Sequence, residues 1–174
     1  MPNWCENDLS VSGDKESLAL FMKSISGDTE MDFTQLVPRP AEQEDNWFNW
    51  NCDNWGTKWA PNEIWISDET DTISAMTFQS AWAPPTELFT AIAKLFPTLD
   101  FALVYSESGM CFCGATLWTK GKLAGDVHVS NYTADPRYEE LVAKDNNGNT
   151  DDFYEELNAL ENLIRDECLD EATR

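Results

Sequence analysis

The feature that most constrains the fold of this 174-residue chain is the order in which strand-like and helix-like segments follow one another. Residues 7–11 alternate as a strand does, and apolar residues at helical spacing follow between Asp14 and Gly27. A second helical pattern begins at residues 83–85 and stops at Pro97. Further strand-like runs cover residues 33–37, 64–66, 72–78, 99–105, 110–119 and 123–129. This order predicts an α+β fold, a ferredoxin-like split βαβ antiparallel sheet with helices on one face.

A tryptophan-rich insertion at about residues 46–60 interrupts this pattern and holds four of the eight tryptophans. Helical geometry would pair Trp47 with Trp50 and Trp55 with Trp59, although Gly56 would break such a helix. Rings of this size are usually buried against a sheet. The alternative is an aromatic groove for a small ligand or peptide, with a lysine as cation–π partner. The predicted groove residues are Trp47, Trp50, Asn54, Trp55, Lys58 and Trp59.

Residues 130–174 differ in composition and are predicted to form an acidic extension to a domain at residues 1–129. A short helical pattern covers residues 134–143, and a break follows at residues 145–149. The last helix then begins at Thr150. Its narrow apolar stripe must pack on the open sheet face or on a second chain, which makes a homodimer the alternative. The stripe consists of Phe153, Leu157, Leu160, Ile164 and Cys168.

The chain carries 32 Asp or Glu and 11 Lys or Arg, a formal net charge of −21. Such a charge argues against direct binding to nucleic acid or to an anionic membrane. Residues 130–174 hold 13 acidic and 4 basic residues, so this short tail carries −9 of the total. The usual explanation is a solvated acidic helix.

A more specific interpretation is that the tail carboxylates imitate the phosphates of DNA. They would then attract a host protein whose basic surface normally binds nucleic acid. The predicted contacts are Asp152, Glu155, Glu156, Glu161, Asp166, Glu167, Asp170 and Glu171.

No motif in the sequence indicates catalysis, a metal site or a cofactor. His128 is the only imidazole, and neither a nucleophile elbow nor a Gly-rich phosphate loop accompanies it. The five cysteines include no CxxC pair and are predicted to be reduced thiols. A zinc site would require Cys5 or Cys52 to approach Cys111 and Cys113 in space. We therefore predict no catalytic residue, no metal and no cofactor, with a hidden enzyme as the remaining possibility.

The first ten residues are polar and lack the features of a secretory signal. The longest apolar runs are far shorter than the ~18 residues that a membrane helix needs. These observations predict a cytoplasmic protein that does not enter a membrane.

Several short strings resemble the YubB-like family of uncharacterised plasmid- and phage-borne proteins. They are the opening Met-Pro-Asn-Trp-Cys-Glu-Asn-Asp at residues 1–8, Asn-Trp-Gly-Thr-Lys-Trp at 54–59, Ala-Trp-Ala-Pro-Pro at 81–85 and Glu-Ser-Gly-Met at 107–110. The resemblance covers about residues 1–129 and implies a ferredoxin-like fold and a mobile-element setting. It brings no established catalytic or binding residues.

The predicted function joins this setting to the charge. We expect a non-enzymatic, mobile-element-encoded protein that inhibits or modulates a host nucleic-acid-handling or defence protein through a DNA-mimic surface. The alternative is a binding module that uses the groove between Trp47 and Trp59.

Overall fold

In the computed structural model, residues 3–27, 30–145 and 150–174 are described, without the side chains of residues 150–152. One six-stranded sheet runs through this part of the chain in the order β2-β3-β1-β4-β5-β6. All of its neighbouring strands are antiparallel. The strands are β1 (Trp4–Gly13), β2 (Asn62–Glu69), β3 (Ile73–Ala81), β4 (Leu99–Glu107), β5 (Phe112–Thr119) and β6 (Lys122–Val129). The predicted α+β class with a ferredoxin-like antiparallel sheet is confirmed.

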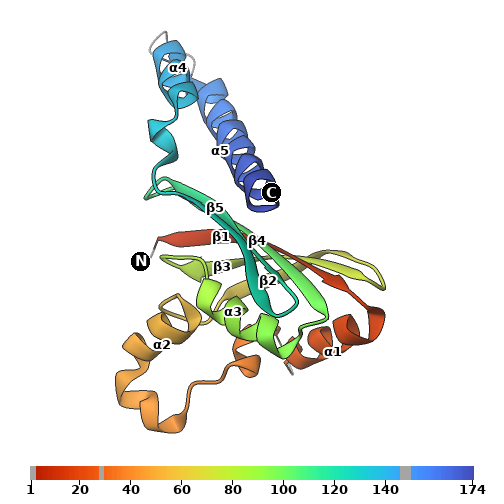
Figure 1. The fold of residues 1–174 in the computed structure, drawn as a ribbon. Helices are drawn as coiled ribbons and strands as arrows, with labels where there is room; N and C mark the ends of the chain where they lie inside the picture. Colours follow the sequence, from red (N-terminus) through yellow and green to blue (C-terminus); the bar gives the residue numbers. More distant parts are fainter. Residues whose placement is uncertain (1–2, 28–29, 146–149) are drawn as a thin grey trace.

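Helices α1 (Lys15–Ile25) and α3 (Thr86–Leu95) cover one face of the sheet (Figure 1). Local signals set the start of both helices. The Asp14 carboxylate caps α1 by accepting a hydrogen bond of 2.9 Å from the Ser17 amide. Pro85 is the N-cap residue of α3, and its carbonyl accepts a hydrogen bond of 3.1 Å from the Phe89 amide.

The main core lies between these helices and the sheet and is rich in phenylalanine. The Phe33 ring meets Phe78 at 5.1 Å and Phe89 at 5.2 Å between centroids, both edge to face. Phe21 makes similar contacts at 5.5 Å with Phe96 and Phe101. Edge-to-face pairs add to the free energy gained by burying the rings. This core is therefore closely packed and aromatic.

Helix α5 (Thr150–Ala172) lies on the opposite face, over β4, β5 and β6 (Figure 1). Helix α4 (Pro136–Asp145) packs beside it. The α5 side chains Leu160, Ile164 and Cys168 form a second, smaller core with Cys113 and Ala115 of β5. Three of the five residues of the expected apolar stripe thus pack on the open face of the sheet of the same chain.

Polar contacts also hold α5 in place. Arg165 pairs with Asp8 of β1, and Arg137 pairs with Glu167 at 2.7 Å. The carboxylate of Glu161 accepts hydrogen bonds from the Tyr132 hydroxyl at 3.0 Å and the Ser108 hydroxyl at 3.1 Å.

One predicted strand is wrong. Residues Phe33–Leu36 form a 3₁₀ helix, η1, in place of the extended run expected at residues 33–37. Asp32 caps this turn by accepting hydrogen bonds from the Thr34 amide at 2.8 Å and the Thr34 hydroxyl at 2.6 Å. The local side-chain cap therefore outweighs the strand pattern.

The predicted break at residues 145–149 lies almost wholly outside the described residues. Among the helices that the structure does describe, none has the length and apolar character needed to cross a bilayer.

Candidate functional site

The tryptophan-rich insertion forms a short helix, α2 (Trp47–Trp55), that divides its aromatic residues between the interior and the surface. Trp55 is buried and donates a hydrogen bond of 2.9 Å from its indole Nε1 to the carbonyl of Val37. Trp50 packs edge to face on Trp55, with 5.4 Å between centroids. Asn54 donates to the Trp50 carbonyl at 2.8 Å, within the helix. The predicted groove residues Trp50, Asn54 and Trp55 thus support the fold.

The other predicted groove residues reach the surface and join Trp4 of β1 and Trp82, which follows the end of β3. The Lys58 ammonium lies 4.5 Å from the ring centroid of Trp59 and 4.5 Å from that of Trp82. Trp4 continues the row beyond Trp59, with 6.2 Å between ring centroids.

On the other side, Phe48 lies 6.2 Å from Trp82 and 5.9 Å from Trp47, both edge to face. We call this continuous surface the aromatic strip. In order along the surface, it consists of Trp47, Phe48, Trp82, Lys58, Trp59 and Trp4.

The strip stands on a closely fixed backbone. Gly56 ends α2 with a φ of +76°, and a Cβ there would lie 3.3 Å from backbone atoms of Pro84, Thr86 and Glu87. The buried Thr57 hydroxyl donates to the carbonyl of Ala81 at 2.8 Å. The side-chain amide of Asn51 donates to the carbonyl of Lys58, also at 2.8 Å. These contacts fix the backbone that carries Lys58 and Trp59.

Trp82, at the centre of the strip, has a φ of +74°, which is unusual for a residue with a side chain. Its amide donates to the carbonyl of Asn3 at 3.0 Å, and the neighbouring Ser80 hydroxyl donates to the carbonyl of Ala83 at 2.8 Å. Such backbone strain costs roughly 1–3 kcal/mol and tends to occur at functional sites. The strain here presents an indole that is 44% exposed.

A cavity of about 470 Å³ lies beside Trp82 at the same end of the sheet. It is bordered by Asn3, Trp82, Met110, Phe112, His128 and Ser130. Its size falls in the range typical of small-ligand pockets. The aromatic strip therefore runs into a hollow that combines apolar walls with a few polar groups.

His128 borders this cavity, and its Nδ1 shares a hydrogen bond of 3.2 Å with the Tyr105 hydroxyl. Burial is the main cause that raises the pKa of Tyr105 above its ordinary value, so its phenol stays protonated at neutral pH. Gly114 makes room for this hydroxyl, because a Cβ there would lie 2.4 Å from it. The arrangement orients an imidazole toward the cavity.

The predicted acidic contacts on α5 also fall into two groups. Glu161 and Glu167 are engaged within the protein, by the Tyr132 and Ser108 hydroxyls and by Arg137 respectively. The hydrogen bonds from Arg137 lower the pKa of Glu167, so it stays ionised. The side chain of Asp152 lies outside the described residues. The exposed remainder consists of Glu155, Glu156, Asp166, Asp170 and Glu171, which take part in no ion pair within the described ranges.

The five cysteines are free thiols, and three of them, Cys111, Cys113 and Cys168, lie in or against the second core. Cys5 is in the main core, and burial raises its pKa to about 12. Cys113 and Cys168 face each other between β5 and α5. The interaction between the two thiols raises the pKa of Cys113 and lowers that of Cys168. In the described part of the chain, no three His, Cys, Asp or Glu residues are grouped as metal ligands would be.

Three members of the strip, Phe48, Trp4 and Trp82, were not among the predicted site residues. Strand pairing brings Trp4 and Trp82 together, because residue 4 of β1 lies opposite residue 81 of β3. A possible signal was their position in the strings at residues 1–8 and 81–85, which contain tryptophans at the ends of strands.

The fold and the family are supported by comparison with known proteins. A family model described as "Ferredoxin-like domain in Api92-like protein" matches residues 54–150. The match spans more than half of the chain, which therefore belongs to this family of ferredoxin-like α+β proteins.

The crystal structure of the protein Api92 from Yersinia pseudotuberculosis is similar, with a TM-score of 0.57. The alignment has 12% sequence identity and covers 78% of this chain and 100% of that one. At this identity the likeness shows the fold alone. No curated protein sequence matches the chain.

Proposed function

We propose that this protein is a non-enzymatic binding module and that the aromatic strip is its binding surface. The observation that carries the proposal is the strip itself, a continuous row of rings held at the surface by a fixed backbone. Trp47, Phe48, Trp59 and Trp82 are each between 36% and 44% exposed. Contiguous exposed aromatic surface is uncommon on soluble domains and marks places where proteins or ligands bind.

The chemistry of the strip fits an apolar segment of a protein or peptide. Tryptophan dominates binding hot spots because it offers a large contact area with little entropy to lose. Lys58 lies between two indoles and adds a charged group that can meet a carboxylate or a carbonyl. The overall charge of −21 disfavours a nucleic-acid ligand, which would otherwise suit a row of rings.

Selection from a random peptide display library tests this proposal. Peptides that bind the wild-type protein should be rich in apolar residues and should bind Trp59→Ala or Trp82→Ala more weakly. We expect a loss of about 2 kcal/mol in each variant, roughly thirtyfold in Kd, measured by fluorescence anisotropy.

Tyr154→Ala is the matched control, since Tyr154 is an exposed aromatic residue on α5, away from the strip. It should bind the selected peptides as the wild type does. The proposal is wrong if no peptide is enriched, or if the selected peptides bind both strip variants with unchanged affinity while circular dichroism shows them folded.

A second candidate function is the acidic mimicry of DNA by α5. The observation in its favour is that Asp166, Asp170 and Glu171 are exposed on a helix that ion pairs anchor to β1 through Arg165 and to α4 through Arg137. Anchored carboxylates can meet a basic surface without a large loss of entropy. Consecutive turns of the helix place such groups about 5–6 Å apart along the axis.

The mimicry is tested by the capture of bacterial nucleic-acid-binding proteins on the immobilised protein. Captured proteins should be released by duplex DNA and by salt, and the triple variant Asp166→Asn/Asp170→Asn/Glu171→Gln should capture roughly tenfold less. The control Glu42→Gln/Glu44→Gln/Asp45→Asn removes the same charge from another surface and should capture normally. If both triple variants captured equally less protein, capture would depend on the total charge and not on the carboxylates of α5.

The resemblance of this chain to YubB-like proteins adds a biological setting to both proposals. A plasmid or phage origin would make a host defence or DNA-handling protein the partner. Cytoplasmic location is part of the same proposal.

A further inference from the structure

Strand β2 forms one edge of the sheet and is almost entirely exposed. Its neighbour on one side is β3, and within the described ranges no strand pairs with its other side. Edge strands of soluble proteins often carry lysine or proline, which discourage pairing with another chain. Between Asn62 and Glu69, β2 carries neither. It therefore presents backbone N–H and C=O groups that a further strand can use.

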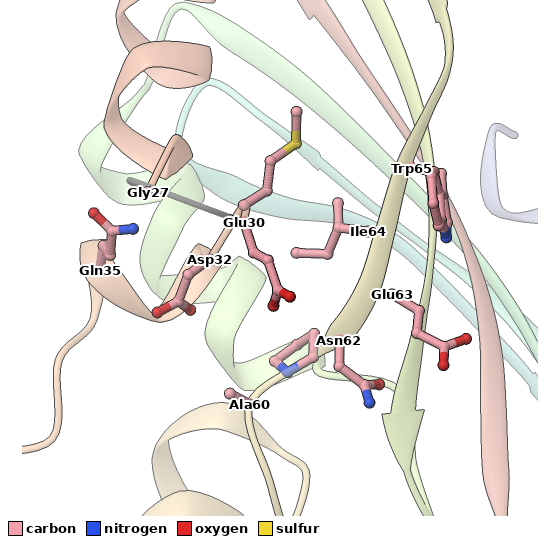
Figure 2. A pocket seen from close by; sticks show the side chains of 11 residues that line it. Gly27, Glu30, Asp32, Gln35, Ala60, Asn62, Glu63, Ile64 and Trp65 are labelled. Atoms are coloured by element: carbon pink, nitrogen blue, oxygen red, sulfur yellow. The ribbon is translucent and has the colours of Figure 1, made fainter.

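A cavity of about 890 Å³ lies alongside the beginning of β2, between it and the segment that leads into η1 (Figure 2). The side chains of Glu30, Asp32 and Ile64 lie on one side of β2, with Glu30 directed into the space between the two segments. Those of Glu63 and Trp65 lie on the other side. Each face of the sheet thus has at least one carboxylate and one apolar side chain beside this edge.

The lining of this cavity includes three carboxylates and no lysine or arginine. In the described part of the chain, Glu30, Asp32 and Glu63 take part in no ion pair. The Trp65 side chain is 70% exposed, which leaves its ring free to stack on a cation. Both the charge and the exposed ring favour a cationic occupant.

We propose that the outer edge of β2 binds an extended basic segment of a partner protein as an added strand. Successive side chains of an extended chain point to opposite faces, so two adjacent lysines or arginines reach the carboxylates on the two sides of β2. The ladder between β2 and β3 has register shifts between Asn62 and Trp65 and between Ile66 and Asp68. The added strand therefore pairs over a few residues, and its side chains supply the rest of the affinity.

Binding of a short fluorescent peptide that repeats Lys-Lys-Val-Val, and so presents lysine on both faces of the added strand, tests the proposal. We expect it to shift the NMR amide resonances of β2 and to bind the wild-type protein at least about tenfold more tightly than a lysine–proline peptide of equal charge. Proline lacks the N–H that the added strand must donate. Equal binding of the two peptides would overturn the proposal, because charge alone would then explain it.

Charge-matched variants show whether binding is local. Glu30→Gln/Glu63→Gln should weaken binding of the lysine–valine peptide by about threefold to tenfold. Asp170→Asn/Glu171→Gln, which removes equal charge from α5, should have little effect. Equal weakening in the two variants, or amide shifts outside β2 and the segment before η1, would contradict the proposal. Trp59→Ala should leave this binding unchanged, which separates the edge site from the aromatic strip.

Discussion

The two faces of the sheet are covered in different ways. Under α1 and α3 the core consists of large rings in mutual contact, with Phe21, Phe33 and Phe89 fully buried. Under α5 it consists of smaller side chains, and ion pairs at Arg165 and Arg137 supplement it. The first face is thus held mainly by apolar burial, which does not depend on the ionisation of side chains. The second depends in part on charge.

This difference implies that the two layers contribute unequally to stability. Burial of aromatic side chains contributes several kcal/mol per residue, whereas exposed ion pairs contribute about 1 kcal/mol or less. We expect α5 to open locally at a lower free energy than the layer of α1 and α3. Substitutions on the two faces can test this expectation.

The largest effect is expected at Phe89, which is fully buried and contacts Phe33, Phe78, Phe101 and Trp118. Phe89→Ala should lower the free energy of unfolding by about 3–5 kcal/mol, because the removed ring leaves a cavity among rigid neighbours. Urea denaturation followed by circular dichroism measures this loss. A loss below 1 kcal/mol would show that the core can collapse around the gap.

A smaller and more local effect is expected at Ile164, which α5 buries against β5. Ile164→Ala should cost about 2 kcal/mol, at the low end for such a substitution, since the surrounding layer is thin and can relax. Hydrogen exchange should speed up in α5 while β1 and β4 remain protected. Uniform acceleration in all elements would mean that the two layers unfold together.

The smallest effect is expected at Arg137, whose partners Asp135 and Glu167 are both ionised at neutral pH. Hydrogen bonds from Arg137 lower the pKa of Asp135 to about 2. Because the folded pKa lies below the unfolded value of about 3.9, this stabilisation is complete above pH 4 and is lost as the pH falls toward 2. Arg137→Ala should therefore cost less than about 1 kcal/mol at pH 6, given the exposure of these groups.

The same variant should match the wild type more closely at pH 2, as measured by urea denaturation at both values. Arg174→Ala removes an exposed arginine that takes part in no ion pair within the described residues, and it should change little at either pH. A pH-independent effect of Arg137→Ala would mean that packing of the arginine side chain matters more than its charge.

The sequence predicted the elements well where one face of a segment is apolar. Gly56 ends α2 as expected, and Leu160, Ile164 and Cys168 are the buried residues of the expected α5 stripe. The prediction failed at η1, where the Asp32 side chain caps a turn that resembles a short strand in sequence. A local hydrogen bond of this kind leaves no trace in apolar periodicity.

The candidate site was predicted only in part, for a related reason. Trp47, Lys58 and Trp59 belong to the aromatic strip, whereas Trp50 and Trp55 of the same insertion are part of the interior. Spacing along a helix shows which rings share a face, but it does not show which face meets the sheet. That choice depends on distant groups, such as the Val37 carbonyl that accepts from Trp55.

The sequence by itself determined the α+β class, the acidic surface and the cluster of aromatic residues between residues 46 and 60, because these follow from composition and local periodicity. Only the tertiary structure decided that Trp4 and Trp82 join Trp59 around Lys58, and that β2 is left at an edge with carboxylates on both sides. Strand order and register rest on long-range pairing, and a one-dimensional pattern does not record which partner a strand selects.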